Sequence, residues 1–373
     1  MTDLAAAARE HARTVVAPSV VRWEREGRFP RYASSAAAVA GLCGLFAPVE
    51  LGGQGRTFAE GIPVFEELGR GDASYAFALS MHNAVTTAIA VHGSSATREA
   101  WARRLTAGEA LGGFSLTEPH AGSDAAAIST RAEPDGDGYR ISGRKAWVSL
   151  AGEADVFLLA CRTGEPPGYG DVMMVVLPAD RPGVDVVRVY DKMASAFLPI
   201  GEVELDGVPI SAEEVLAPPG AGFQAALGAI DVARADIAAI AVGLAAEALD
   251  IALAYARDRR MFGGTALDLE AIQFMLADVE TDVVAGRLLY RYAAERLGTP
   301  EGSVAAAHAK RFCPDAALRA AIACSEVLGA YGWLNDTPLP RFIALAKMLQ
   351  VVDGTTEIQR VVIARDLRRR VET

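Results

Sequence analysis

Apolar and polar positions in the first third of the chain repeat at helical spacing. Over residues 3–113, alanine-rich segments with this spacing are interrupted at Pro18, Pro30 and Pro48. Proline ends a helix because it has no amide hydrogen to donate and its ring clashes with the preceding turn. We therefore expect residues 1–113 to form a domain built of helices.

The spacing changes near residue 114. After the turn sequence Asp135–Gly138, Tyr139 and Ile141 alternate with polar residues. Further short apolar or alternating runs follow at Val156–Ala160, Val172–Leu177, Val184–Val189 and at Val203, Leu205 and Val208. Short runs separated by glycine and proline turns are typical of strands. Residues 114–217 are therefore predicted to form a β-barrel or sandwich of roughly 100 residues.

Helical spacing returns after Pro218 and Pro219 and continues to the end of the chain. Apolar residues fall three and four apart in two stretches, at Ile237, Ile240, Ala241, Leu244, Ala248 and Ile251, and at Ile272, Leu276, Val279 and Val283. Long apolar stripes of this kind suit a helix bundle. With residues 218–373 as a helical bundle, the expected fold class is α+β.

The composition excludes some partners and compartments. The 373 residues are 51% hydrophobic with a net charge of −11, which predicts a large core and no basic surface for nucleic acid. The four cysteines lack the close pairing of zinc or redox motifs, so we expect no metal site. No continuous apolar run reaches the roughly 18 residues of a membrane span, and the N-terminus lacks a basic segment followed by an apolar one. We expect a cytoplasmic protein outside the membrane.

Groups suited to a flat, polar cofactor gather in two segments of the middle domain. Phe114–Asp124 and Lys145–Ser149 combine hydroxyls, backbone amides and one indole. Amides and hydroxyls can bond the heteroatoms of a ring in its plane, and an aromatic or apolar side chain can cover its face. These two segments are therefore the first candidates for a binding site.

Four motifs give the chain a resemblance to the acyl-CoA dehydrogenase family. Thr117–Asp124 is similar to the family's Thr-Glu-Pro-x-Ala-Gly-Ser-Asp run, and Gly143–Ser149 to its Gly-x-Lys-x-Trp segment. Arg257–Gly263 resembles its Arg-x-x-Phe-Gly signature, and Asp353–Arg360 its Glu-Gly-Thr-x-x-Ile-Gln-Arg signature. The motifs occur in family order over nearly the whole chain.

The resemblance implies FAD as the cofactor. The residues it places along the isoalloxazine and ribityl groups are Phe114, Leu116, Thr117, Ser123, Trp147 and Ser149, and it adds Thr355 and Glu357 to the flavin contacts. Thr117 and Ser149 can donate or accept in the ring plane, and Trp147 can shield the ring from water. Taken singly, a strand tryptophan is also a common core residue and a threonine before Glu-Pro a common turn cap.

A second set of residues is implied to reach the flavin of a neighbouring subunit in a homotetramer. Arg259, Met261 and Phe262 match the positions that contact its pyrophosphate and adenosine, and a guanidinium can fork onto phosphate oxygens. Glu326 and Ala330 match two further adenosine positions. Met261 departs from the usual Gln or Thr, and Glu326 and Ala330 depart from the usual Gln and Gly. These departures affect the implied adenosine contacts, whereas Arg259 is still present for the pyrophosphate.

The resemblance also implies a substrate site. Asp231 and Arg234 match the helix segment that meets the CoA chain, although the two could simply form an ion pair. Ser123 and Gly354 are further substrate candidates. Polar residues of the helix over 78–92 are candidates for the floor of the acyl pocket or, alternatively, ordinary polar residues at a helix surface, namely His82, Asn83, Thr86 and Thr87.

Asp353 is the expected catalytic base. Oxidation of an acyl thioester requires a base for the proton beside the carbonyl while hydride leaves the next carbon. Most of the family has Glu at this position, so the carboxylate here is one methylene shorter. Ala233 stands where some members have their catalytic Glu, which excludes that alternative base. The other interpretation of Asp353 is a helix cap.

The function implied is FAD-dependent dehydrogenation of an acyl thioester to an enoyl thioester. The acyl group would ride on CoA or on an acyl carrier protein, and a flavoprotein could accept the electrons. Two enzymatic alternatives keep the fold, a nitroalkane oxidase, which uses an Asp base, and a flavin monooxygenase. A third alternative is a relative that binds flavin and an acyl carrier without turnover.

Overall fold

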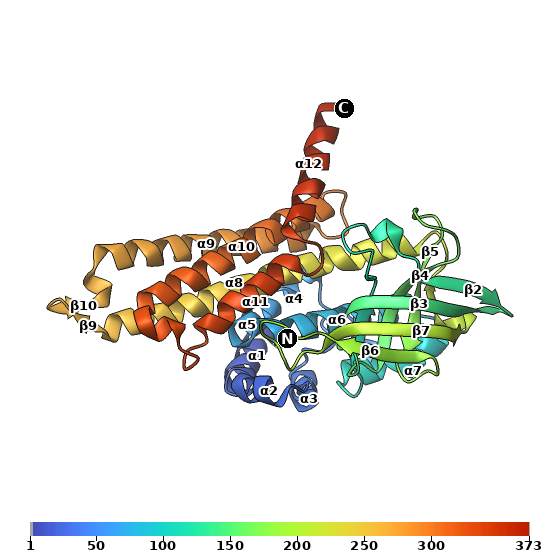
Figure 1. The fold of residues 1–373 in the computed structure, drawn as a ribbon, viewed down its shortest axis with the longest axis horizontal. Helices are drawn as coiled ribbons and strands as arrows, with labels where there is room; N and C mark the ends of the chain where they lie inside the picture. The colour runs from blue at the N-terminus through green and yellow to red at the C-terminus, as the bar shows by residue number, and fades with distance from the viewer. Residues whose placement is uncertain (1–2, 373) are drawn as a thin grey trace.

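The chain folds as the α+β arrangement that the sequence predicts. The structure is a computed structural model, and it describes residues 3–372. Helices form the N-terminal part, a sheet forms the middle part at one end of the molecule, and long helices form the C-terminal part (Figure 1). One helix, α12, stands away from this body (Figure 1).

The N-terminal part consists of helices, as predicted. They are α1 (Leu4–His11), the π-helical η1 (Ala12–Val16), α2 (Val20–Glu26), α3 (Arg31–Val39), η2 (Val49–Leu51), α4 (Phe58–Gly61), α5 (Pro63–Gly71), α6 (Ala73–His92) and α7 (Ser95–Thr106). The side chain of Asp72 caps α6 by accepting from the amide of Tyr75 at 2.8 Å. Asp72 also pairs with Arg341, which ties the start of α6 to the C-terminal helices.

The middle part is one eight-stranded sheet. The strands are β1 (Gly112–Ser115), β2 (Arg131–Asp135), β3 (Gly138–Ser149), β4 (Val156–Arg162), β5 (Val172–Pro178), β6 (Val184–Val189), β7 (Ile200–Ile210) and β8 (Val215–Ala217). Their order is β6-β7-β3-β2-β4-β5-β8, and β1 pairs with β4 in parallel. The predicted turn joins β2 to β3, where Asp135 pairs with Gly138 and Gly136 has a φ of 64°. The predicted strands are thus confirmed.

The C-terminal part contains the longest helices, and both predicted apolar stripes lie on them. The helices are α8 (Gly222–Asp258), α9 (Glu270–Arg296), α10 (Gly302–Leu328), α11 (Leu339–Val351) and α12 (Thr356–Glu372). Shorter elements connect them, the strands β9 (Arg260–Met261) and β10 (Gly264–Thr265) and the 3-10 helices η5 (Ala266–Asp268) and η6 (Gly329–Trp333).

The apolar composition of helix α8 bears on the expectation that the chain contains no membrane span. Its most apolar window has a mean hydropathy of 2.0, so by length and composition this helix passes the test for a membrane span. Within the fold, however, 72% of that window is buried. Burial of this kind is what the core helix of a soluble protein shows, and α8 packs against α5, α6, α9 and α10.

Close backbone packing fixes α8 against the N-terminal helices. A Cβ atom at Gly243 would lie 2.0 Å from the carbonyl oxygen of Glu66, and one at Gly69 would lie 2.5 Å from that of Ile240. Glycine at both positions therefore lets α5 and α8 approach closely. Since α8 continues from this contact to the sheet, it sets the distance between the helical and β parts.

Candidate active site

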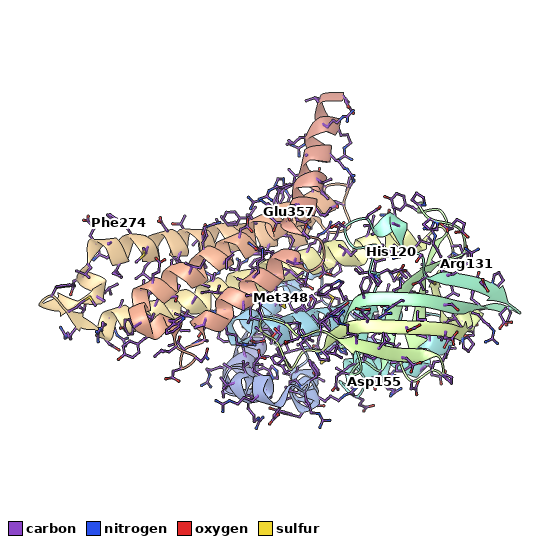
Figure 2. All side chains as sticks on the ribbon, in the orientation of Figure 1. His120, Arg131, Asp155, Phe274, Met348 and Glu357 are labelled. Carbon is purple, nitrogen blue, oxygen red and sulfur yellow. The ribbon has the colours of Figure 1, made fainter. Side chains whose placement is uncertain are left out.

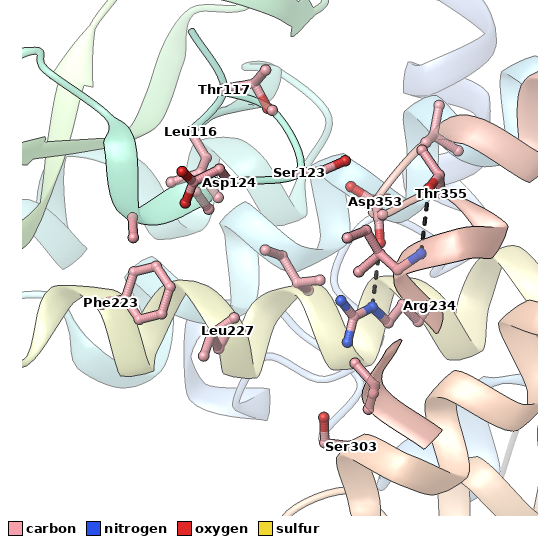
Figure 3. A pocket seen from close by; sticks show the side chains of 18 of the residues that line it. Leu116, Thr117, Ser123, Asp124, Phe223, Leu227, Arg234, Ser303, Asp353 and Thr355 are labelled. Atoms are coloured by element: carbon pink, nitrogen blue, oxygen red, sulfur yellow. Dashed lines mark hydrogen bonds between the residues drawn. The ribbon is translucent and has the colours of Figure 1, made fainter. Parts of the chain in front are cut away.

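A cavity of about 1420 Å³ lies where the sheet, α6, α8 and the loop between α11 and α12 meet. Figure 3 shows the segment with Leu116, Thr117 and Ser123 on one side and Asp353 and Thr355 on the other, with Arg234 on α8 below them. The cavity is large enough for more than one extended organic molecule, since sites for single drug-sized ligands span roughly 300–1,000 Å³.

The structure brings ten of the predicted residues to this cavity. Those that line it are Phe114, Leu116, Thr117, Ser123, Trp147, Ser149, Arg234, Asp353, Gly354 and Thr355. They come from four separate stretches of the sequence, so the fold assembles the site from both the sheet and the helical bundle.

Trp147 reaches the cavity because β3 bulges at this point. The pairing of β3 with β7 shifts register between Lys145 and Val148, and Trp147 has a φ of 57°. A bulge reorients the side chain at the extra residue. Trp147 is 61% exposed, and its indole packs against the ring of Tyr190, tilted by 33° with 4.4 Å between ring centroids. Trp147 is therefore a cavity-facing aromatic and not a core residue.

A buried ion pair supports the segment that contains Thr117 and Ser123. Lys145 Nζ donates to Glu118 Oε1 at 2.8 Å and to the carbonyl oxygen of Leu116 at 2.9 Å. Glu118 also accepts from the amides of Ser129 and Thr130 at 2.7 and 2.9 Å. Burial raises the pKa of Glu118, but Lys145 and these donors outweigh it and lower that pKa to about 2.

This pair has a supporting role that our sequence reasoning did not assign. The signal was present, because Glu118 and Lys145 occupy fixed places in the first two motifs. A cation and an anion with almost no exposed surface need each other, since either alone would be an uncompensated buried charge.

Asp353 lies in the loop between α11 and α12 with its carboxylate in unusual surroundings. Its φ of 50° and the φ of 96° at Gly354 are both left-handed. Among the described residues, no hydrogen-bond partner reaches the buried Oδ2 atom of Asp353. Burial raises the pKa of Asp353 to about 6, against the lowering effect of Lys310 and Arg234. A carboxylate of this kind is available to exchange a proton near neutral pH.

Arg234 contacts both Asp231 and the Asp353 loop. Its Nη1 donates to Asp231 Oδ1 at 2.8 Å, and its Nε donates to the carbonyl oxygen of Asp353 at 3.3 Å. The ion pair considered from the sequence is therefore present, and Arg234 faces the cavity as well. Asp231 is not among the lining residues and accepts from Ser303 at 3.2 Å.

None of the four residues predicted for the acyl pocket lines this cavity. His82 Nδ1 accepts from the amide of Gly112 at 3.2 Å, and its Nε2 lies 3.1 Å from the carbonyl oxygen of Leu105. Burial lowers its pKa to about 4, so the ring is neutral. Thr86 and Thr87 donate to carbonyl oxygens one turn earlier in α6.

The face of α6 that does reach the cavity is apolar. It presents Phe77 and Met81, which are four residues apart and therefore share one side of the helix. Asn83, which was considered with His82, is fully buried and bonds the carbonyl oxygen of Leu42 at 2.8 Å. Polar residues in this buried helix therefore did not indicate the pocket, because backbone groups already satisfy their hydrogen-bonding atoms.

The residues predicted to serve a neighbouring subunit lie away from the cavity. Arg259, Met261 and Phe262 follow α8 at the end of the bundle opposite the sheet (Figure 1). Phe262 is 91% exposed. Glu326 and Ala330 are exposed near the start of η6, and Tyr331 beside them lies 6.1 Å from Tyr255 of α8 between ring centroids. The two groups therefore share one end of the molecule.

Glu357 also differs from its predicted neighbours. It is exposed at the start of α12 (Figure 2) and pairs with Arg360 at 3.1 Å. Within its own chain it does not line the cavity beside Asp353 and Thr355.

Known proteins match this chain over all three parts. The acyl-CoA dehydrogenase N-terminal, middle and C-terminal domain models match residues 2–109, 113–208 and 220–368. The probable acyl-CoA dehydrogenase fadE25 of Mycobacterium leprae is 33% identical over 369 residues, covering 98% of this chain and 95% of the relative.

Solved structures agree with the sequence matches. Butyryl-CoA dehydrogenase from Megasphaera elsdenii is 30% identical with a TM-score of 0.93, covering 98% of both chains. Glutaryl-CoA dehydrogenase from Mycobacterium smegmatis in complex with FADH2 is 26% identical with a TM-score of 0.91, covering 98% of this chain and 93% of that one. With family models on every domain and relatives aligned end to end, the chain belongs to the acyl-CoA dehydrogenase family of flavoprotein oxidoreductases.

Proposed function

We propose that the protein binds FAD and dehydrogenates an acyl thioester to an enoyl thioester, with Asp353 as the base. The observation on which this rests is Asp353, which lines the large cavity and whose buried Oδ2 atom has no hydrogen-bond partner among the described residues. An unpartnered buried carboxylate oxygen is costly, so a role in binding or proton transfer accounts for it best.

The cavity wall fits a flavin. Thr117 and Ser149 supply hydroxyls, Trp147 supplies an exposed indole, and all three lie on the sheet side of the cavity. Hydroxyls can bond the ring heteroatoms, and the indole can exclude water from the ring. Thr355 lines the opposite side beside Asp353. When bound there, FAD would supply the acceptor for the hydride.

The chain itself supplies the base and its surroundings. With a pKa of about 6, Asp353 is mostly ionised at pH 7 and can take the proton from the carbon beside the thioester carbonyl. Among residues 3–372, no protein acceptor pairs with the Asp353 amide, so this amide is available to the thioester oxygen, where negative charge develops. Arg234 fixes the carbonyl of the same residue.

We propose a homotetramer in which each flavin site is completed by a second chain. Arg259, Met261, Phe262, Glu326 and Ala330 are the residues we assign to the neighbour's FAD. Their place at one end of the bundle, far from the cavity of their own chain, supports this assignment (Figure 1). Exposed apolar side chains such as Phe274 on α9 (Figure 2), which is 62% exposed, also favour an assembled state.

We also propose the acyl carrier and the electron acceptor. The acyl carrier is CoA or an acyl carrier protein, and the electron acceptor is a flavoprotein. The relatives are CoA-thioester enzymes by name, which favours CoA. We place the protein in the cytoplasm, outside membrane and nucleic-acid complexes.

Anaerobic mixing with thioesters tests the proposed function. Purified protein with FAD is mixed with saturated acyl groups of several chain lengths, each presented on CoA and on an acyl carrier protein. We expect the oxidised flavin absorbance to bleach with at least one thioester, because hydride transfer reduces the flavin. Reduction by nitroalkanes, or by NADH with oxygen consumption, and by no thioester would favour the oxidase or monooxygenase alternatives. No reduction by any of these would favour a non-catalytic relative.

A further inference from the structure

A buried lysine lies behind the loop that contains Asp353. Lys310, on α10, has no exposed surface. Its Nζ donates to the carbonyl oxygen of Leu349 in the last turn of α11 at 2.7 Å and to that of Gly354 at 3.3 Å. The proposed reaction does not by itself require a cation there.

The burial of this ammonium is costly and has few compensations. Its two hydrogen-bond acceptors are neutral carbonyl oxygens, and an isolated buried cation is strongly destabilising. Burial lowers the pKa of Lys310 to about 8, Asp353 raises it, and Arg234 lowers it further. Asp315 and Cys313 on its own helix have smaller effects. Asp353 is therefore the main anionic group that favours the charged lysine.

The loop needs restraint because its backbone is strained. Asp353 has a φ of 50°, a conformation that a non-glycine residue rarely adopts, and the left-handed Gly354 follows. The Gly354 carbonyl accepts from Lys310 and from Gln359 Nε2 at 2.9 Å, while the Asp353 carbonyl accepts from Arg234. Three side chains from α8, α10 and α12 thus fix two consecutive carbonyls.

We propose that Lys310 is a positioning residue for the reaction, which joins the end of α11 to the Gly354 carbonyl and thereby directs the Asp353 carboxylate into the cavity. This inference rests on the proposed role of Asp353 as base. Lys310 is the only one of the three donors that bonds both the end of α11 and the loop. A base misplaced by about 1 Å can lose on the order of a hundredfold in rate.

The ammonium has a second, electrostatic effect on the same carboxylate. A nearby cation favours the ionised form, so Lys310 keeps the pKa of Asp353 lower than burial alone would. Because the Asp side chain is short, it cannot compensate for a displacement of the loop backbone. Position and charge of the lysine therefore act on the same step.

Two variants separate these effects. Lys310→Met is nearly isosteric and removes both the donor and the charge, whereas Lys310→Gln keeps an amide donor without the charge. Lys347→Met is the matched control, because Lys347 is an exposed cation on α11 that bonds Gln350 and not the loop carbonyls. FAD content and circular dichroism establish that each variant is folded.

The main measurement is the limiting rate of anaerobic flavin reduction by thioester as a function of pH. We expect Lys310→Met to reduce flavin at least about tenfold more slowly, with wild-type FAD content and an apparent base pKa above the wild-type value. Lys310→Gln should regain part of the rate and keep the raised pKa. Lys347→Met should match the wild type. Wild-type rate and pH profile in Lys310→Met would overturn the proposal.

Hydrogen exchange of the amides over residues 352–356 separates this inference from the proposed function, because it needs no turnover. Faster exchange in Lys310→Met or Lys310→Gln than in wild type and Lys347→Met supports positioning of the loop. Equal exchange in all four proteins overturns it. If no thioester reduces the wild-type flavin, the proposed function fails, and the exchange experiment still decides whether Lys310 restrains the loop.

Discussion

At the scale of single residues, charges buried inside the protein decide what the site can do. Burial raises the pKa of Asp353, which lies in the loop between α11 and α12, whereas Lys310 on α10 and Arg234 on α8 lower it, and Asp353 in turn favours the charged form of Lys310. A fourth group, Asp236, is buried on α8 and accepts from Ser80 Oγ at 2.8 Å. Burial raises its pKa well above the ordinary value, and Asp353 raises it further.

The raised pKa of Asp236 predicts a pH-dependent change in stability. The folded state binds this proton more tightly than the unfolded state, whose pKa is about 3.9, so folding stability is lost as pH rises above that value. Asp236→Asn mimics the protonated form and should therefore raise Tm at pH 8. The gain should shrink as the pH falls toward about 4. A gain independent of pH, or a loss at pH 8, would contradict the raised pKa.

The sequence could predict the site residues that belong to a motif. It could not predict those that reach the site only through the packing of distant elements. Thr117, Trp147 and Asp353 were expected at one site and do line one cavity. Lys310 lies in an alanine-rich helix, and nothing near it in the sequence indicates a role. Its contact with the last turn of α11 is visible only in the folded structure. His82 was misleading because its partners, the backbone of β1 and α7, are far away in sequence.

At the scale of elements, hydrophobic spacing predicted the type of helix and strand but not how closely they approach. The stripe on α8 indicated a buried helix, yet the contact with α5 depends on two glycines that no spacing rule identifies. Conversely, β6 was predicted from its valines, but most of its residues are exposed at the edge of the sheet. Edge strands keep β-forming residues without burying them, so apolar content alone does not locate the core.

The α5–α8 contact predicts the cost of adding one methyl group. Gly243→Ala would place a Cβ atom 2.0 Å from the carbonyl oxygen of Glu66, so the helices must separate. We expect a loss of about 1–3 kcal/mol in stability, measured by thermal or denaturant unfolding. Gly228→Ala is the matched control on the same helix, because its Cβ atom would meet nothing within 4 Å. Equal stability of the two variants would refute close packing at Gly243.

At the scale of the whole molecule, the proposed flavin site needs residues from more than one chain. The cavity is lined by residues of the sheet, whereas the residues that follow α8 lie at the end of the bundle opposite the sheet (Figure 1), which suits an assembly in which each chain completes its neighbour's site. Sequence motifs indicated both groups of residues. They could not show that the groups are separated, since that separation follows from the length of the 37-residue helix α8.

Arg259→Ala tests this assembly through the cofactor. Loss of a guanidinium that forks onto phosphate should weaken FAD retention by about tenfold or more, measured as the FAD-to-protein ratio after gel filtration. Arg257→Ala serves as the control, since Arg257 is exposed on the same turn and pairs with Asp258. Dissociated protein should likewise lose its flavin. Full retention in Arg259→Ala, or a monomer that keeps FAD tightly, would contradict the shared site.

The central claim is that Asp353 is the base, and Asp353→Asn tests it most directly. The variant is loaded with FAD, mixed anaerobically with a thioester that reduces the wild type, and followed at the oxidised flavin band. An amide cannot accept the substrate proton, so the account predicts a loss of at least about a hundredfold in the reduction rate with FAD still bound. Flavin reduction at the wild-type rate in Asp353→Asn would contradict it and place the base elsewhere.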